Sequence, residues 1–129
     1  MTKKTQNQNR KPGVRTKLFI ANETIGVGKV KLLSLVEEVG SISEAARQMG
    51  MSYRRAWFLL DSMQSGFRLP LLVTKRGGAG KGGAKVTPLG KELIQRYHAH
   101  AMLVDQNSED IRTWMESVQA PALPKEVKK

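Results

Sequence analysis

The sequence from residue 41 to residue 63, SISEAARQMGMSYRRAWFLLDSM, predicts two helices joined by a tight turn. Ser43 is expected to cap the first helix, because its hydroxyl can accept a backbone N–H of the first turn. Gly50 can end that helix with a positive φ, and Ser52 is expected to cap the second helix. The apolar residues of the second helix recur at helical spacing: Ala56, Leu59, Leu60 and Met63. The pattern is typical of a helix-turn-helix, whose second helix enters the DNA major groove, although an ordinary αα-hairpin would share it.

The charge of the chain is high and unevenly distributed. The 129 residues carry a formal net charge of +11 at pH 7, which favours a polyanionic partner, nucleic acid before an anionic membrane. Residues 1–17 contain six basic residues and no acidic residue. Residues 47–85 contain eight basic residues and one acidic residue, Asp61, whereas acidic residues outnumber basic ones in 18–46 and in 86–119. The positive charge therefore concentrates on the second helix, the segment after it and the N-terminal arm.

Several functional classes find no support in the composition. The chain has no cysteine, so it has no disulfide, thiol nucleophile or cysteine-zinc site. No apolar run approaches the ~20 residues of a membrane span, and no hydrophobic stretch follows the basic N-terminus as in a signal peptide. His98 and His100 point to different faces of a predicted helix, so we expect no metal site there. We predict a cytoplasmic protein that is not an enzyme, without a cofactor or membrane partner.

The segment before residue 41 predicts a basic arm, a strand and a supporting helix. Residues 1–15 are polar and basic and are expected to be disordered, either lying along DNA phosphates or without a role. Residues 17–21 are consistent with a strand, and residues 22–27 with a connection. Residues 28–39 have the apolar spacing of an amphipathic helix, which Gly40 would end.

A glycine-rich segment between two short strands follows the second helix. Residues 71–76 and 85–87 read as strands, and the intervening segment 77–84 has five glycines and one lysine, Lys81. A strand, a glycine loop and a strand in this position predict a β-hairpin wing over 75–85, whose backbone can approach a sugar-phosphate chain. The alternative, a phosphate-binding loop for a nucleotide, requires Ser or Thr where Gly82 follows Lys81.

The C-terminal part predicts one long helix and a dimer. Thr87 and Pro88 form a helix start, and no proline or glycine follows Gly90 until Pro121, so we expect a single helix to Val118. About 30 residues make a rod of ~45 Å, longer than a small domain is wide. Its apolar residues approach heptad spacing, with Tyr97, Val104, Ile111 and Met115 on one seam. A second copy of the chain would cover that seam.

Three groups of residues resemble a known family. Residues 52–55, 71–76 and 87–90 resemble the DNA-binding domain of LysR-type regulators, and more closely that of ModE-type molybdate-responsive transcriptional regulators. The closer likeness rests on segments 40–43, 50–53, 56–57 and 77–84. The resemblance implies a fold that is mainly α with a small β-hairpin: a winged helix-turn-helix with a long C-terminal dimerisation helix. It also implies that Ser52, Tyr53, Arg54 and Arg55 lie near the major groove.

Phe58 departs from the resemblance, because related sequences tend to be polar at this position. At 100° per residue it shares an arc with Arg54, Arg55, Asp61 and Ser62, opposite the apolar residues of the same helix. It could therefore contact a thymine methyl or a sugar. Alternatively the helix is rotated, so that Phe58 covers the core and Trp57 is exposed; otherwise Trp57 is expected to pack at the margin of the buried arc.

These observations predict a sequence-specific regulator that binds double-stranded DNA as a homodimer, through a recognition helix over 52–66 and the basic wing. The expected domain covers 16–119, followed by a disordered tail over 120–129. The candidate DNA-binding residues are Ser43, Ser52, Tyr53, Arg54, Arg55, Phe58, Lys75, Arg76, Lys81 and Lys85. A nucleoid-type binder of low specificity, or an adaptor that uses the long helix, is the alternative. The resemblance does not extend to an oxyanion-binding domain, so any molybdate response is expected from a separate partner chain.

Overall fold

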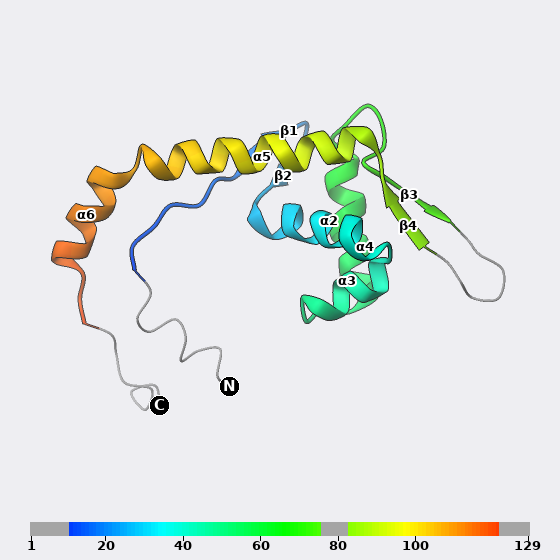
Figure 1. The fold of residues 1–129 in the computed structure, drawn as a ribbon, viewed down its shortest axis with the longest axis horizontal. Coiled ribbons are helices and arrows are strands. Elements are labelled where there is room, and N and C mark those ends of the chain that lie inside the picture. The colour runs from blue at the N-terminus through cyan, green and yellow to red at the C-terminus, as the bar shows by residue number, and fades with distance from the viewer. Residues whose placement is uncertain (1–10, 76–82, 122–129) are drawn as a thin grey trace. The chain divides into compact units, whose positions relative to one another are not determined.

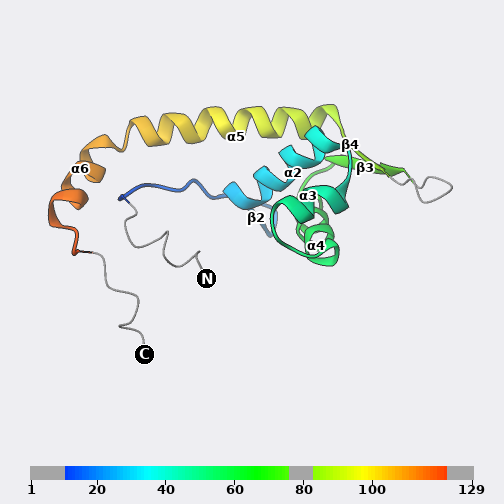
Figure 2. The same cartoon turned by 60° about the horizontal axis from the view of Figure 1, so that its bottom comes forward.

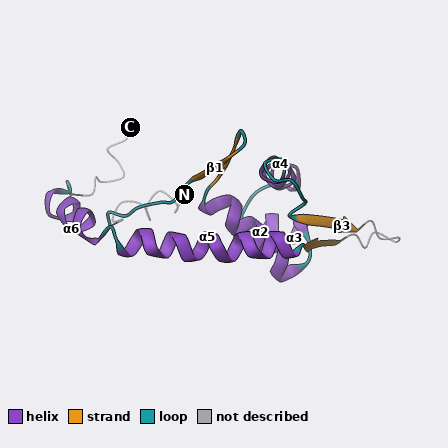
Figure 3. Ribbon diagram, turned by 90° about the horizontal axis from the view of Figure 1, so that it is seen from above, coloured by secondary structure: helices purple, strands orange, loops and turns teal. Residues whose placement is uncertain are grey.

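The structure is a computed structural model that describes residues 11–75 and 83–121. Helices make up most of these residues, and the strands form two short antiparallel pairs (Figure 3). This content agrees with a class that is mainly α and is consistent with a winged helix, but it has two strand pairs where one small β-hairpin is expected. In chain order the elements are β1 (Leu18–Ile20), β2 (Glu23–Ile25), α2 (Val27–Val39), α3 (Ile42–Gln48), α4 (Tyr53–Gln64), β3 (Leu72–Lys75), β4 (Gly83–Val86), α5 (Pro88–Gln106) and α6 (Glu109–Val118).

The buried core lies in one of two parts into which the chain separates. This part, Arg15–Ala101, contains every buried apolar side chain of the described residues, and no polar or charged side chain of those residues is buried. All its helices and both strand pairs contribute to the core. α2 contributes most, with four buried residues at helical spacing: Val30, Leu32, Leu33 and Val36. The predicted supporting helix before Gly40 is therefore confirmed.

The first strand pair corrects the expectation for residues 22–27. β1 confirms the predicted strand, but the predicted connection is wrong, because β2 lies within it and pairs with β1 from Leu18↔Ile25 to Ile20↔Glu23. Ile25 is buried in the core, and this anchors the second strand. Ala21, in the two-residue turn, has φ +54°, a left-handed conformation that costs a residue with a Cβ ~1–2 kcal/mol.

α3 and α4 form the predicted pair of helices and lie against each other (Figures 1 and 2). Gly50 in the turn between them has φ +71°, as its position requires. The predicted cap at Ser43 is wrong, because α3 begins at Ile42 and the Ser41 hydroxyl accepts the Glu44 N–H at 3.1 Å. Ser43 is an exposed residue of the first turn. The Ser-x-x-Glu spacing of Ser41 and Glu44 is the sequence signal that identifies this cap.

α5 begins as predicted and completes the core. The Gly90 N–H bonds to the Thr87 side-chain oxygen at 3.1 Å, which confirms the cap. A Cβ at Gly90 would lie 2.2 Å from the Leu71 carbonyl oxygen, so only glycine fits here. Tyr97 is 2% exposed, and its hydroxyl donates to the Thr16 carbonyl at 2.6 Å. Burial raises the pKa of this hydroxyl. Tyr97 therefore packs inside its own chain and is not part of a seam for a second copy.

The predicted single helix from Pro88 to Val118 is wrong. α5 ends at Gln106 and α6 begins at Glu109. The Ser108 hydroxyl donates to the Val104 carbonyl at 2.6 Å, and Arg112 donates to the Asp105 carbonyl at 2.8 Å. Asparagine and serine side chains compete with the backbone for hydrogen bonds inside helices, and Asn107 and Ser108 occupy the break. The ~45 Å rod is thus replaced by two shorter helices.

Candidate nucleic-acid interface

α4 starts at a capped turn that sets which side chains lie at its N-terminus. The Ser52 hydroxyl accepts the Arg55 N–H at 3.1 Å, which confirms the predicted cap and begins the helix at Tyr53. Tyr53, Arg54 and Arg55 consequently occupy its first turn. In helices that read DNA, the N-terminal residues of the recognition helix contact the base edges.

The two sides of α4 differ sharply in burial. Ala56, Leu60 and Met63 are buried, so the helix has the orientation predicted from its spacing. On the other side Tyr53 is 52% exposed and Phe58 is 62% exposed, and both arginines are exposed. Because the core side is fixed in this way, the alternative in which Phe58 covers the core is wrong.

Within the described residues the arginines of α4 form no ion pair, whereas the arginine of α3 does. In α3, Arg47 donates to Glu44 through Nε at 3.0 Å. The hydrogen bonds from Arg47, and then from Gln48, lower the pKa of the Glu44 carboxyl from 4.5 to about 2. The ion pairs within the described residues do not include Arg54 or Arg55. Two cationic groups of α4 are therefore available to an external anion.

The second hairpin has one packed face and one exposed face. Its register pairs Leu72 with Val86 and Val73 with Lys85. Paired residues share a face, so Leu72 and Val86 turn to the core, where both are buried. Val73, Lys75 and Lys85 lie on the opposite face and are exposed. The structure thus brings two of the predicted basic residues together on one surface of the hairpin.

Backbone contacts fix the base of this hairpin to the helices. The Gln64 side-chain oxygen accepts the N–H groups of Leu71 at 2.8 Å and Leu72 at 3.1 Å, tying the end of α4 to the start of β3. The Ala84 N–H donates to the Gly40 carbonyl at 3.0 Å, which ties β4 to the end of α2. β3 and β4 extend outward from this base (Figure 1). The contact made by Gln64 was missed, because nothing in the sequence distinguishes it from a solvent-facing glutamine.

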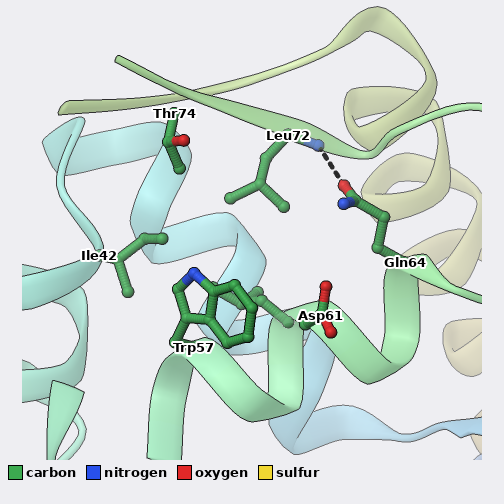
Figure 4. Close-up of a pocket in the computed structure, with 7 residues that line it drawn as sticks. Ile42, Trp57, Asp61, Gln64, Leu72 and Thr74 are labelled. Atoms are coloured by element: carbon green, nitrogen blue, oxygen red, sulfur yellow. Dashed lines mark hydrogen bonds between the residues drawn. The ribbon is translucent and has the colours of Figure 1, made fainter. Parts of the chain in front are cut away.

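A small pocket of about 130 Å³ lies between α4 and β3. The indole ring of Trp57 lies between Ile42 and Asp61, below Leu72 and Thr74 (Figure 4). Trp57 is 44% exposed, so the predicted packing is only partial: its ring lines this pocket and remains open to solvent. The Asp61 carboxylate borders this pocket, toward the hairpin.

Some predicted site residues stay untested by this geometry. Arg76 and Lys81 lie outside the described residues, as does most of the predicted glycine loop. Ser43 is exposed on α3, away from the cap to which it was assigned. Across 11–75 and 83–121, no three His, Asp or Glu side chains are grouped as metal ligands. No helix within the same ranges is long and apolar enough to span a membrane.

No family model matches the chain. It is 40% identical over 75 residues to the molybdenum-pterin-binding protein MopB of Rhodobacter capsulatus, which covers 58% of this chain and 28% of MopB. It is 36% identical over 75 residues to the DNA-binding transcriptional dual regulator ModE of Escherichia coli, covering 58% and 29% of the two chains. With the transcriptional regulator ModE of Haemophilus influenzae the identity is 33% over 87 residues, covering 61% and 34%. The chain spans about a third or less of the length of these relatives. Over more than half of its own length it is similar to ModE-type regulators, and this confirms the predicted resemblance.

Proposed function

We propose that this chain is a sequence-specific, DNA-binding transcriptional regulator with a winged helix-turn-helix fold and no enzymatic activity. The observation that carries the proposal is the outer side of α4, where Arg54 and Arg55 are exposed beside the exposed ring of Phe58. Neither arginine forms an ion pair with any residue that the structure describes. The similarity to proteins named transcriptional regulators supports a DNA-binding role for the matched part.

In this proposal α4 is the recognition helix and the hairpin β3–β4 is the wing. Arg54 and Arg55 would read guanine, because a guanidinium can donate to O6 and N7 together. Lys75 and Lys85, with Arg76 and Lys81 of the same segment, would contact phosphates, which position the protein without reading sequence. Tyr53 and the serines Ser43 and Ser52 would add contacts around the start of the helix.

We also propose a homodimer, with α6 as an apolar contact. Ile111, Trp114 and Val118 are exposed and fall on one arc of about 60° of this helix. Glu109 and Glu116 lie on the opposite side, and their negative charge does not suit a DNA surface. A second copy presents the same apolar stripe, so a two-fold arrangement would bury both stripes. A two-fold dimer implies half-sites separated by multiples of ~34 Å on a palindromic operator.

Arg54→Ala and Lys85→Ala separate base reading from phosphate binding. Arg54→Ala should weaken binding to a selected site by ~1–3 kcal/mol and relax the preference at one base pair. Lys85→Ala should weaken binding to all sequences alike and reduce the slope of log affinity against log salt by about one. Fluorescence anisotropy with the selected site and with random DNA, each at several salt concentrations, measures both effects.

Arg96→Ala is the matched control, since this α5 arginine is exposed and paired with Glu92. It should change binding to neither DNA. If Arg54→Ala lowers binding to selected and random DNA equally, the chain binds without sequence reading, as a nucleoid-type protein would. If the unaltered protein does not bind DNA even in low salt, it acts as an adaptor through its helices.

An oxyanion response would reside in a separate partner chain. The name of MopB states that this relative binds a molybdenum-pterin compound, and the match covers 28% of that protein. Calorimetry with molybdate tests this part of the proposal, which expects no saturable binding to these 129 residues tighter than ~10 μM. A one-to-one isotherm below that value would instead assign a sensor to the chain.

A further inference from the structure

Phe58 is the most exposed of the three aromatic side chains of α4, ahead of Tyr53 at 52% and Trp57 at 44%. It is 62% exposed, whereas Leu60 and Met63 of the same helix are almost completely buried. The only ring–ring contact among the described residues joins Tyr97 and His98. Phe58 therefore neither contributes to the core nor stacks on another described aromatic side chain.

The neighbours of Phe58 on the helix surface identify the kind of surface it belongs to. Arg54 precedes it by one turn and Arg55 lies on its other flank, and both lack ion pairs in the described residues. An apolar protein partner would have to desolvate these two charges without neutralising them. A DNA groove neutralises them with phosphates and offers guanine acceptors. The acidic Asp61 does not oppose this, because its carboxylate borders the pocket beside Trp57.

We infer that Phe58 reads the C5-methyl group of a pyrimidine, in ordinary DNA a thymine, in the major groove. The methyl group of thymine is the apolar feature of that groove, and apolar side chains such as phenylalanine contact it. This inference rests on the proposed function and adds a specificity determinant to it. A sugar contact would give no preference among bases, whereas a methyl contact distinguishes thymine from cytosine.

The spacing of the two residues predicts how the read bases are arranged. Phe58 follows Arg54 by four residues, which is about 6 Å along the helix. Base pairs repeat about every 3.4 Å along the duplex. A helix lying along the groove therefore places the methyl group about two base pairs from the guanine read by Arg54. Because the arginine side chain is long, the expected separation ranges from roughly one to three base pairs.

Replacing single thymines by uracil tests the inference, since uracil lacks only the C5-methyl group. A site is first selected from random duplexes with the full chain, and each of its thymines is then replaced in turn. With the unaltered protein, one position per half-site should lose affinity by about fourfold, the size expected for one methyl-sized apolar contact. At that position, 5-methylcytosine paired with guanine should bind better than cytosine paired with guanine.

Phe58→Ala should bind the thymine and uracil sites equally at that position. Phe58→Leu keeps an apolar side chain and should retain the sensitivity, which also covers the case in which the alanine variant folds poorly. Phe19→Ala is the matched control, because this phenylalanine is 75% exposed on β1, outside α4. It should leave the uracil effect unchanged.

Two results would overturn the methyl contact and leave the proposed function standing. One is a selected site without any uracil-sensitive thymine, and the other is a uracil effect that persists in Phe58→Ala. Either would leave α4 as a recognition helix with another role for the ring. Failure to select any sequence, with equal binding to random duplexes, overturns the proposed sequence specificity as well. The outcomes therefore separate a wrong contact from a wrong function.

Discussion

α4 and α6 are amphipathic helices of similar length, 12 and 10 residues, that use their apolar sides differently. α4 buries Ala56, Leu60 and Met63 in the core, whereas α6 has no buried residue and leaves Ile111 and Trp114 exposed. The apolar side of α4 is thus buried within the chain, and its outer side is basic and aromatic. The apolar side of α6 has no such cover among the described residues. The first helix is suited to a charged partner and the second to an apolar one.

The largest expected effect tests whether these two apolar sides contribute to the same core. Leu60→Ala should lower the free energy of unfolding by ~2–5 kcal/mol, because it leaves a cavity in a packed interior. Trp114→Ala should change the stability of the monomer by less than ~0.5 kcal/mol. Urea unfolding at several protein concentrations measures both, and separates loss of folding from loss of self-association.

Trp114→Ala should instead reduce the concentration dependence of the unfolding midpoint, because it removes part of the proposed contact between copies. Glu116→Gln in the same helix lies away from the apolar stripe and should not. If Trp114→Ala destabilises the protein at every concentration as strongly as Leu60→Ala, α6 packs on its own chain and the contrast between the two helices is wrong.

The next largest loss of stability is expected at Gln64, because its side chain joins the end of α4 to β3. Gln64→Ala removes the acceptor for two N–H groups and should lower the free energy of unfolding by ~1–3 kcal/mol. It should also speed hydrogen exchange of the Leu71 and Leu72 amides. Gln106→Ala is the control, an exposed glutamine at the end of α5. Equal effects of the two variants would show that the tie at Gln64 does not hold the hairpin.

The helix starts differ as well, although both begin after a serine. Ser52 accepts an N–H of α4, whereas Ser108 has no side-chain cap bond and donates to the Val104 carbonyl. Ser52→Ala should therefore lower the free energy of unfolding by about 1 kcal/mol, with a range of ~0.5–2 kcal/mol. Ser108→Ala should lower it by less. Thermal unfolding monitored by circular dichroism ranks the two. A larger loss for Ser108→Ala would mean that the corner between α5 and α6 contributes more than a cap.

Most elements predicted from the sequence have a full helical period or a fixed turn residue. α2 and α4 have apolar side chains at helical spacing, and Gly50 and Thr87 mark a turn and a helix start. The orientation of α4, and hence the exposure of Arg54, follows from that spacing alone. The placement of Lys75 and Lys85 on the same face of the hairpin also follows from strand alternation, once the register that pairs Val73 with Lys85 is known.

The remaining features depend on contacts that leave little trace in the sequence. β2 has three residues, too few to show an alternating pattern, and its place is fixed by the burial of Ile25. The break after Gln106 contains neither glycine nor proline. Ser41 and Ser43 are both plausible caps until Glu44 is used to choose between them. Tyr97 fits a seam by spacing, but its burial and its hydrogen bond to the Thr16 carbonyl show that it is internal.

The smallest expected effect concerns a charge that is already paired inside the chain, in contrast to the α4 arginines, which form no ion pair in 11–75 and 83–121. The hydrogen bonds from Arg47 and Gln48 lower the pKa of Glu44 from 4.5 to about 2. Because the folded state holds the proton less tightly than the unfolded state, the contribution is complete above pH ~4.5 and disappears as the pH falls to about 2. The Glu44 side chain is partly exposed to solvent, so solvent screening keeps the contribution small.

Glu44→Gln removes the titrating group and keeps the shape of the side chain. Above pH ~4.5 the unaltered protein should have the slightly higher midpoint of thermal unfolding, and the difference between the two proteins should vanish as the pH falls toward about 2. Glu38→Gln, an exposed substitution in α2, is the control and should show no such trend. High salt should shrink the Glu44 difference further, because exposed charges are screened over roughly 10 Å at 0.1 M. A difference that stays constant from pH 5 to pH 2 would show that the ionisation of Glu44 does not contribute to stability, and that its ion pair with Arg47 leaves that arginine as available to an external anion as Arg54.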